Sequence, residues 1–414
     1  MGLRAHFNPV KEEGSKPRAM LKYESMPDQI TPPSSAKDGG VIKKLSEFGE
    51  GFKHHHENYE APSITALRET GGTWKLGQLT FHFPEHFGFC YGVDKAIDMV
   101  FETCDRFRGK RIFLTDQLIH NPHINGKLKE KGVRYLSRDP KHLLACDELK
   151  EGDVVVVSAF GTDFRDIQVL KKKGAMIVDS TCGAIINVWK RVEGYAKQGF
   201  ITIMHGKRDH EETRATVSQA VKEGGRYLII ENRAEAEELA AAIRADEGAK
   251  DFGFDAKSCR MGMANQTKML KGESLAIQEI LRRAFRSRFG DEATLDRFRS
   301  FDTICGATQD RQDAMRGLLG KDLDLILVVG GFNSSNTTHL AELAVGKASF
   351  YHIEGADDIH SREQIRARDT LTGEVKIYCG WLPEDARNIG ITSGASTPDV
   401  ILLDIIEKIA ACVL

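Results

Sequence analysis

One local pattern occurs three times in the chain, and each copy joins an apolar run to a helical pattern at a cysteine. In one copy, Ala-Met-Ile-Val is followed by Asp-Ser-Thr, then by Cys182, a glycine and an amphipathic run. Cys305 follows Asp-Thr-Ile and precedes Gly-Ala, while Cys90 lies in Gly-Phe-Cys-Tyr-Gly before another helical pattern. Small polar residues such as Asp, Ser and Thr often begin a helix. The pattern therefore predicts three strand-to-helix junctions, each with a thiol at the start of the helix.

A thiol at the start of a helix lies near free backbone N–H groups and the positive end of the helix dipole, which favour the thiolate. The three cysteines are on the order of a hundred residues apart, which suggests three similar lobes that meet at one centre. Three thiolates on a four-iron cubane would leave one iron open to a substrate. A single intracellular cysteine is more often a small buried apolar residue. The wide spacing also does not distinguish an iron–sulfur cluster from zinc.

Apolar runs typical of strands alternate with helical patterns from Leu79 onward, and this alternation is typical of α/β units. We expect an α/β fold of three similar lobes with mostly parallel sheets around a central iron–sulfur site. Ligands of such sheets bind at the carboxyl ends of the strands, where the cysteines also occur. The expected parts are an amino-terminal extension (1–75), a first lobe (76–180, completed by about 385–414), a second lobe (181–303) and a third lobe (304–384).

The expected extension is polar and charged, and Pro-Pro-Ser-Ser and two Gly-Gly pairs interrupt it. We expect an arm that packs loosely on the body, with one helix near residues 41–53. Its His54-His55-His56 tract could bind a metal, although a solvated polar tract is the favoured interpretation.

The composition excludes several classes of protein. Lys and Arg number 58 against 60 Asp and Glu in 414 residues, so nothing indicates a nucleic-acid or membrane surface. Hydrophobic residues make up 41% and charged residues 29%, as in globular proteins of roughly two to four domains. Eight cysteines without a secretion signal fit a reducing compartment, and no apolar run reaches the ~18–20 residues of a membrane span. We therefore expect a cytoplasmic protein.

Polar loops follow several of the expected strands, and the loop 330–336 is the most informative. Two glycines after a strand, then Ser-Ser-Asn at a helix start, would form an anion site from backbone N–H groups, hydroxyls and the helix dipole. The loop lacks the Gly-Lys-Ser/Thr of a P-loop, and a plain helix cap is the alternative interpretation. A second such loop contains Ser396. Two anion loops together with His120 suit a diphosphate better than a single phosphate.

His210 and Glu212 follow another expected strand, two positions apart. If their loop faces the centre, the pair could deliver protons, with the carboxylate as the immediate donor. The alternative is an ordinary charged helix start. Thr267 is a weaker candidate, because a threonine near a turn is common.

Eight motifs occur in the order found in one known family. They are Gly-Phe-Cys-Tyr-Gly-Val (88–93), His-Asn (120–121), Asp-Ser-Thr-Cys (179–182), His-Glu-Glu-Thr (210–213), Asn-Gln-Thr (265–267), Thr-Ile-Cys-Gly-Ala-Thr-Gln (303–309), Asn-Ser-Ser-Asn-Thr (333–337) and Gly-Ile-Thr-Ser-Gly-Ala-Ser-Thr-Pro (390–398). The chain resembles the 4-hydroxy-3-methylbut-2-enyl diphosphate reductases of the LytB/IspH type, in particular their plant-like long branch. The resemblance covers about residues 80–410.

The resemblance implies three α/β lobes around one 4Fe–4S cluster per chain and a reductive dehydroxylation. The products would be isopentenyl and dimethylallyl diphosphates, with electrons from a ferredoxin- or flavodoxin-like partner. The implied cluster ligands are Cys90, Cys182 and Cys305. Glu212 would be the proton donor, positioned with the substrate hydroxyl by Thr267. The implied diphosphate-binding residues, with His210 beside them, are His120, Ser334, Ser335, Asn336 and Ser396.

Two positions depart from the family pattern. Many members have a diphosphate-binding histidine in Ser-Ala-His-Gly, but here the segment contains Phe160, which cannot donate to a phosphate oxygen. Lys268 replaces a second threonine often found after Thr267, and we expect it to point to solvent. Two rival functions stay open: a zinc or dithiol enzyme that uses the same cysteines on a phosphorylated substrate, and a non-enzymatic iron–sulfur redox sensor. A sensor would need no anion loops.

Overall fold

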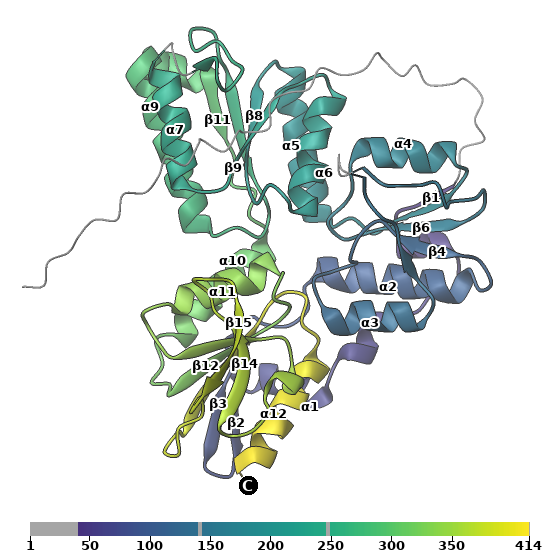
Figure 1. The fold of residues 1–414 in the computed structure, drawn as a ribbon, viewed down its shortest axis with the longest axis vertical. Helices are drawn as coiled ribbons and strands as arrows, with labels where there is room; N and C mark the ends of the chain where they lie inside the picture. The colour runs from purple at the N-terminus through teal and green to yellow at the C-terminus, as the bar shows by residue number, and fades with distance from the viewer. Residues whose placement is uncertain (1–39, 140–142, 246–248, 414) are drawn as a thin grey trace, which may run out of the picture.

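The computed structural model describes residues 40–139, 143–245 and 249–413, which form three α/β lobes, each built on one sheet (Figure 1). In Figure 1 the second lobe lies at the top, the first at the right and the third at the bottom. The prediction of an α/β fold with mostly parallel sheets is confirmed. Among the helices of these described ranges, none has the length and apolar character needed to span a membrane. The first 39 residues of the predicted extension lie outside the described ranges.

The first lobe contains a parallel sheet of five strands in the order β1-β7-β6-β4-β5. All four valines of its β6 are buried, because a parallel sheet is covered by helices on both faces and needs continuous apolar runs. The strands are β1 (Val41–Ile42), β4 (Ile112–Leu114), β5 (Arg134–Tyr135), β6 (Val154–Val157) and β7 (Met176–Asp179). The helices are α2 (Tyr91–Arg106), α3 (Pro122–Glu130) and α4 (Phe164–Lys172).

The second lobe contains a parallel sheet of four strands in the order β11-β10-β8-β9. Its core is aliphatic and aromatic, with Ile203, Met263 and Phe285 fully buried. The strands are β8 (Ile201–His205), β9 (Tyr227–Ile230), β10 (Met261–Asn265) and β11 (Phe298–Ser300). The helices are α5 (Gly183–Lys197), α6 (Glu211–Lys222), α7 (Arg233–Arg244) and α9 (Lys271–Arg297).

The third lobe contains seven strands in the order β15-β14-β13-β12-β16-β3-β2, parallel in the middle and antiparallel at both edges. The parallel strands are β3 (Leu79–His82), β12 (Leu325–Val329), β13 (Phe350–Ile353) and β16 (Asn388–Ser393). The antiparallel strands are β2 (Thr73–Leu76), β14 (Gln364–Arg368) and β15 (Val375–Cys379). The helices are α1 (Pro62–Glu69), α10 (Gly306–Leu318), α11 (Ser335–Ala344) and α12 (Asp399–Val413), with the short 3-10 turn η3 (Ala356–Asp358).

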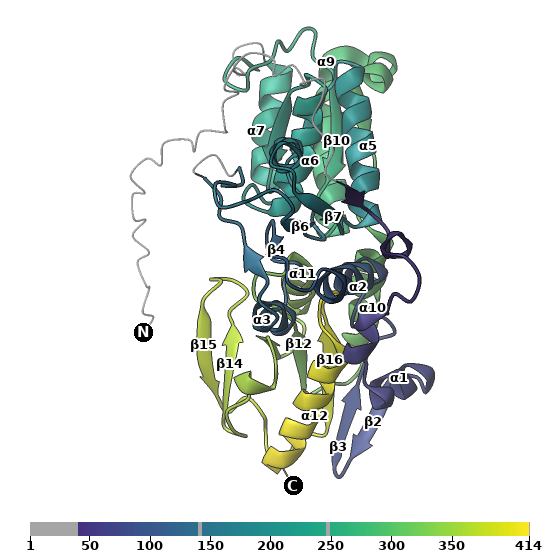
Figure 2. The ribbon, with the colours of Figure 1, turned by 90° about the vertical axis from the view of Figure 1, so that its right-hand side faces the viewer.

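The sheets divide the chain differently from the expected boundaries. We expected residues 385–414 to complete the first lobe, but β16 lies in the third sheet, between β12 and β3. Ile389 is paired with Leu325 on one side and with Phe81 on the other, so strands from both ends of the chain share one core. Figure 2 shows α12 beside the β2–β3 hairpin. The apolar pattern of β16 predicts a buried strand but contains no information about its neighbours.

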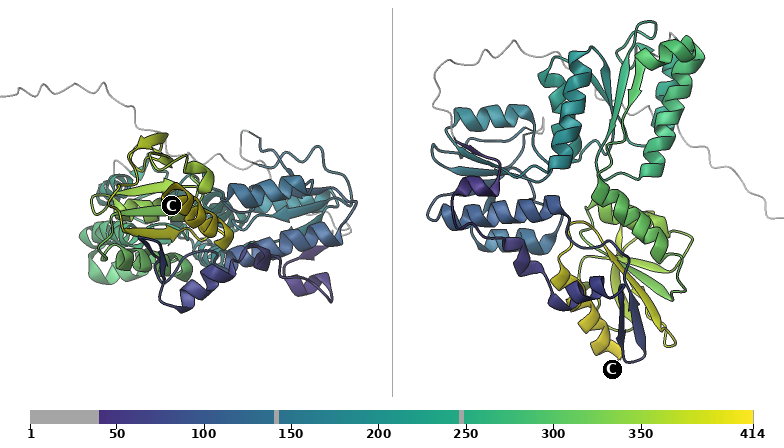
Figure 3. Two further views of the ribbon diagram at one scale, coloured as in Figure 1. Left: turned by 90° about the horizontal axis from the view of Figure 1, so that it is seen from below. Right: turned by 180° about the vertical axis from the view of Figure 1, so that it is seen from behind.

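The described part of the extension is built into the body rather than packed loosely on it. β1 adds a strand to the first sheet and β2 adds one to the third. The helix expected near residues 41–53 is only a short 3-10 turn, η1 (Leu45–Phe48). From behind, the segment runs along the first lobe beside α2 (Figure 3).

The histidine tract is not simply solvated, which corrects the favoured interpretation. It leads into the 3-10 turn η2 (His55–Tyr59), which packs on α2. His56 Nδ1 lies 2.9 Å from both carboxylate oxygens of the buried Asp98, and His54 Nδ1 lies 3.1 Å from the same carboxylate. His55 Nε2 lies 3.1 Å from Glu102. The tract therefore attaches the extension to α2 through carboxylates.

Candidate functional site

One cavity of about 250 Å³ is lined by residues from all three lobes. It brings together every predicted site residue except Glu212, which lies directly behind it. The predicted residues that line it are Cys90, His120, Cys182, His210, Thr267, Cys305, Ser334, Ser335, Asn336 and Ser396. A larger hollow of about 550 Å³, near α1 and α10, contains none of them. The chemistry-bearing residues are therefore concentrated in the smaller cavity.

Each of the three cysteines caps the first turn of a helix, as the repeated pattern predicts. Cys90 precedes α2, Cys182 precedes α5 and Cys305 precedes α10, all with extended backbone and none with a capping hydrogen bond from its side chain. The three residues line the cavity, and Cys305 Sγ also lies 3.1 Å from the Thr308 hydroxyl. The backbone N–H groups of Cys90, Cys182 and Cys305 donate to the carbonyls of Ala395 (3.3 Å), Ala159 (3.0 Å) and Thr267 (3.2 Å), respectively, which also line the cavity.

The spacing of the three sulfur atoms does not match a site for a single small ion. Across the described residues, the three Sγ atoms do not form a set in which all lie within 4.8 Å of one another. Sulfur atoms around a tetrahedral zinc ion would lie about 3.8 Å apart, given Zn–S bonds of about 2.3 Å. At least one pair of these sulfur atoms is therefore farther apart than in such a zinc site, and the donor set consists of sulfur alone.

Close packing fixes one of these thiols. A Cβ atom on Gly92 would lie 2.6 Å from Cys182 Sγ, so the backbone of α2 approaches that sulfur without room for a side chain. Gly92 follows Cys90 by two residues in the first turn of α2. The glycine therefore lets two of the three thiol-bearing segments meet.

Burial acts to raise the pKa values of the Cys90 and Cys182 thiols, and nearby positive charges act to lower them. Burial and the other two cysteines raise the pKa of the Cys182 thiol, although Lys268 and a helix N–H group partly offset this. Burial also acts to raise the pKa of Cys90, but Lys268, Arg311 and N–H groups of α2 outweigh it, so that pKa is lowered. Arg311 is held in place because it donates to the carbonyls of residues 88 and 89, at 2.6 and 3.1 Å.

The prediction that Lys268 points to solvent is wrong. Its side chain lines the cavity together with the three cysteines. Burial acts to lower the pKa of Lys268, but the three cysteines and Glu212 outweigh it and raise that pKa, so the ammonium stays charged. The lysine lies in the loop after β10, at the carboxyl end of the second sheet, and this end faces the cavity. The sequence alone did not show on which side of that loop the lysine lies.

Glu212 is a buried carboxyl group with one oxygen left unpaired. Its Oε1 accepts a hydrogen bond of 2.5 Å from the backbone N–H of Thr267, while Oε2 has no hydrogen-bond partner. Only 1% of the residue is exposed, and burial raises its pKa in spite of Thr267 and Lys268, which lower it. Burial therefore favours the protonated form of this carboxyl group more than water does.

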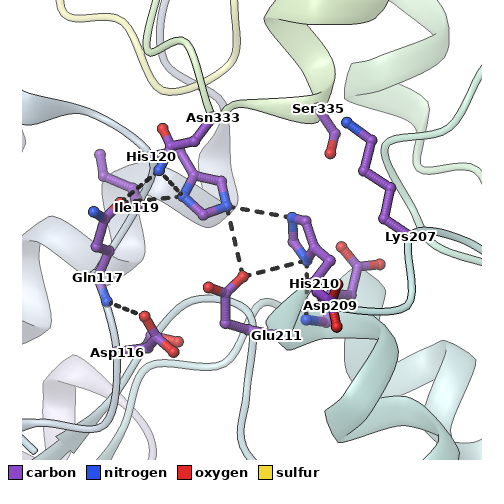
Figure 4. Close-up of polar contacts among 12 residues, drawn as sticks. Asp116, Gln117, Ile119, His120, Lys207, Asp209, His210, Glu211, Asn333 and Ser335 are labelled. Atoms are coloured by element: carbon purple, nitrogen blue, oxygen red, sulfur yellow. Dashed lines mark hydrogen bonds and ion pairs between the residues drawn. The ribbon is translucent and has the colours of Figure 1, made fainter. Parts of the chain in front are cut away.

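His120 and His210 meet edge to face, with their Nε2 atoms 3.3 Å apart (Figure 4). The backbone N–H of Glu212 donates to His210 Nδ1 at 3.1 Å, which leaves the Nε2 of a neutral His210 to carry the proton. Burial lowers the pKa of both rings, that of His120 to about 4, so both are neutral near pH 7. Glu211 Oε2 lies 3.7 Å from His120 and 3.5 Å from His210. Burial and Asp116 raise the pKa of Glu211 to about 7.

The two loops predicted to bind an anion lie side by side at this cavity. The Ser334 hydroxyl caps α11, and Ser335 Oγ accepts a 3.4 Å hydrogen bond from a glutamine of the second lobe. Asn336 Oδ1 accepts from the backbone N–H of Ala395 at 2.9 Å, whereas its buried Nδ2 has no partner. Ser396 donates to the His120 carbonyl at 3.2 Å. Hydroxyls, a free amide and a helix N-terminus therefore converge on one wall.

Comparisons with known proteins bear on this site. The family model described as LytB protein matches residues 82–410. The chain belongs to the LytB protein family. A relative in Gloeobacter violaceus, named 4-hydroxy-3-methylbut-2-enyl diphosphate reductase, is 41% identical and covers 85% of this chain and 87% of its own.

Two solved structures share the fold. One is an (E)-4-hydroxy-3-methyl-but-2-enyl diphosphate reductase, described as the terminal enzyme of the non-mevalonate pathway. The match covers 80% of this chain and 99% of that chain, with a TM-score of 0.52 and 24% sequence identity. The other, a reductase from Plasmodium falciparum, covers 79% and 86%, with a TM-score of 0.61 and 20% identity.

Phe160 occupies the position where many LytB proteins have a histidine, and here its ring packs against two other histidines, His120 and His210. Its ring stacks on His120, with centroids 4.4 Å apart, and meets His210 edge to face at 5.2 Å. The phenylalanine therefore supports the two histidines and offers no hydrogen bond itself.

Three residues of this LytB site were missed from sequence. Gln117 and Asn333 lie 3.3 and 3.2 Å from His120 Nδ1 and orient that ring from two lobes. Gln117 belongs to no helix-start pattern that could have marked it, whereas Asn333 opens the quoted Asn-Ser-Ser-Asn-Thr motif. Glu211 stands in the quoted His-Glu-Glu-Thr motif, and its place beside a candidate acid at a helix start was a usable signal.

Proposed function

We propose that this chain is a 4-hydroxy-3-methylbut-2-enyl diphosphate reductase, the last enzyme of the methylerythritol phosphate route to isoprenoids. In the reaction the C–O bond to the hydroxyl breaks and a C–H bond forms. Two electrons and two protons are consumed, and the hydroxyl leaves as water. The products are isopentenyl diphosphate and dimethylallyl diphosphate. The observation that carries the proposal is the single cavity that joins three thiols, an anion-binding wall and a buried acid.

The three thiols would hold a 4Fe–4S cluster, one per chain. Cys90, Cys182 and Cys305 provide a sulfur-only donor set at one cavity, and the charged Lys268 lines the same cavity. When bound, such a cluster supplies electrons and an open iron that accepts the substrate hydroxyl.

The anion wall would hold the diphosphate. Ser334, Ser335 and Asn336 place hydroxyls, an amide and the start of α11 on it, and Ser396 and His120 complete it from the neighbouring loops. His210 lies beside His120, and its Nε2 can donate to an anion when the substrate is present. The free Nδ2 of Asn336 is a donor that lacks a partner and fits a phosphate oxygen.

Glu212 would supply the proton that lets the hydroxyl leave. Burial raises its pKa, which favours the protonated form, and its free Oε2 is the oxygen from which a proton can be given. Thr267 fixes this carboxyl by its backbone N–H and also lines the cavity, where its hydroxyl can hold the substrate hydroxyl.

The remaining parts of the proposal concern its setting. The electron donor is a ferredoxin- or flavodoxin-like protein, and the reaction takes place in the cytoplasm. The charge balance, with 58 basic and 60 acidic side chains, indicates no nucleic-acid partner.

Anaerobic turnover tests the function. The purified protein is given the hydroxylated diphosphate and a strong one-electron reductant, and both products are followed while the absorbance of the protein is recorded. We expect a brown protein that forms both products. A colourless protein with stoichiometric zinc, or a cluster-bearing protein that neither binds nor converts the diphosphate, would contradict the proposal and support one of the rival functions.

A further inference from the structure

The cavity has only one permanent positive charge. Of the described residues that line it, Lys268 alone is a lysine or arginine. The two histidines on the wall are neutral near pH 7, because burial lowers the pKa of each. Arg311 lies close to the thiols but does not line the cavity, and its Nη1 and Nη2 atoms donate to carbonyl groups.

Lys268 has no partner of its own among the residues that the structure describes. In the described part of the chain its ammonium makes no hydrogen bond or ion pair, although it faces the three cysteines and Glu212. The other lysine near the site, Lys207, does not line the cavity, and Figure 4 shows it beside Ser335 at the edge of the polar cluster. Lys268 is only half-buried, but an ammonium that is partly removed from water and has no partner is still costly unless a negative charge accompanies it. Its position therefore points to a negatively charged occupant of the cavity.

We propose that Lys268 is the charge determinant of this cavity, which both strengthens binding of the diphosphate ligand and makes the thiol-bound centre easier to reduce. The inference rests on the proposed function and deepens it, because it assigns a role to a residue at which the chain departs from the threonine common in the family. Lys268 would contact the anionic ligand directly and act on the centre through space.

Both effects have the same electrostatic cause. Three thiolates and a diphosphate add several negative charges to a cavity walled by protein from three lobes, and reduction adds one more. Charges interact more strongly at the low effective dielectric of such a site than in water. A fixed cation nearby therefore favours the bound anion and the reduced state, and charge near an iron–sulfur centre is a known determinant of its potential. A threonine at this position could supply a hydrogen bond but no charge.

The test compares variants of the cluster-loaded protein by two measurements. One is the midpoint potential of the centre, from a redox titration followed by electron paramagnetic resonance. The other is the dissociation constant of inorganic diphosphate, from calorimetry. Lys268→Met removes the charge and keeps the length, Lys268→Arg keeps the charge, and Lys271→Met is the matched control. Lys271 lies three residues further on, and its partly exposed side chain pairs with Asp302 at 3.1 Å.

We expect Lys268→Met to shift the potential to more negative values and to weaken diphosphate binding about tenfold, the size of one charge-assisted hydrogen bond. Lys268→Arg and Lys271→Met should match the wild type in both measurements. Wild-type values of both quantities in Lys268→Met, or a change in only one of them, would overturn the inference. If Lys268→Met loses its iron, the Lys268→Arg variant decides the outcome. Full iron together with a wild-type midpoint potential and diphosphate affinity in Lys268→Arg would support the role of the charge. The same loss of iron in Lys268→Arg would overturn the inference.

The two proposals fail in different ways. If the wild type turns over the hydroxylated diphosphate and Lys268→Met is indistinguishable from it, the inference falls and the proposed function stands. If the wild type carries a cluster but forms no product, the proposed function falls, while the potential and the diphosphate affinity of the variants still measure the role of Lys268.

Discussion

The backbone N–H of Thr267 donates a hydrogen bond of 2.5 Å to Glu212 Oε1, which joins the loop after β10 to the first turn of α6. This bond fixes one oxygen of the carboxyl, while the other oxygen has no hydrogen-bond partner among the described residues. Different oxygen atoms therefore position the acid and carry out its chemistry, because Oε1 is held by the hydrogen bond and Oε2 is free. The two neighbouring residues of the loop, Thr267 and Lys268, therefore serve the same carboxyl in different ways.

Glu212→Gln should bind the cluster and the diphosphate normally and lose most of its turnover. The amide has nearly the same shape but no proton to give, and general acid catalysis is worth about 10²–10⁴-fold. Steady-state turnover under anaerobic conditions measures the loss, and iron content and diphosphate affinity serve as controls. Turnover within a factor of about three of the wild type would remove Glu212 from its proposed role.

Cys182→Ser should abolish the iron–sulfur centre, because the alcohol is a poor ligand for iron compared with a thiolate. Iron analysis and visible absorbance of the anaerobically purified protein measure the effect. Cys379→Ser is the matched control, since Cys379 is an exposed free cysteine of β15 that does not line the cavity. A full complement of iron in Cys182→Ser would show that the ligand set is different.

Gly92→Ala should also lose most of its iron, although alanine is the better helix former. The added methyl group would lie 2.6 Å from Cys182 Sγ and must displace that sulfur or the helix. Gly194→Ala is the matched control, because a Cβ there meets nothing within 4 Å and the residue lies on α5, the helix that Cys182 begins. Equal iron in both variants would mean that the sulfur can move without loss of the centre.

Glu211→Gln should change how stability depends on pH. The pKa of Glu211 is about 7 in the folded protein, above the ordinary value of 4.5 for a glutamate, so between these values the folded state binds more protons than the unfolded state. This carboxyl therefore makes the free energy of unfolding fall as pH rises from about 4.5 to about 7. A glutamine at this position cannot titrate, so the variant should lack this part of the pH dependence of the free energy of unfolding.

Denaturant unfolding of both proteins at pH 5 and pH 8 isolates the effect. The two histidines beside Glu211 act in the opposite sense, because their lowered pKa values make stability rise with pH below about 6.5, and they remain in both proteins. The stability of Glu211→Gln relative to the wild type should be greater at pH 8 than at pH 5. An equal difference at the two pH values would show that Glu211 titrates normally.

Features encoded by short stretches of chain could be predicted from sequence. Cys182 is an example, because an apolar run, a cap and an amphipathic run all lie within fifteen residues and fix its place at a helix start. The serines of the loop after β12 were predicted for the same reason. When a strand is followed by glycines and a helix start, the serine hydroxyls lie at the N-terminus of that helix.

Features that depend on distant partners could not be predicted. The pairing of Ile389 with Phe81 joins opposite ends of the chain, and nothing near either residue indicates the other. The prediction that the Lys268 side chain points to solvent was wrong for a similar reason. Its charge made solvent the simple expectation, and only the thiols gathered from three lobes make a buried ammonium favourable. The stack of Phe160 on His120 likewise joins two loops that are separate in sequence.

The place of β16 between β3 and β12 has a consequence for biosynthesis. The strand that precedes Cys90 cannot complete its sheet until residues 388–393 have left the ribosome, and the N–H of Cys90 then finds its acceptor on Ala395. A nascent chain that already displays all three thiols therefore still lacks the frame that orients the first of them. We expect metal delivery to follow translation rather than accompany it.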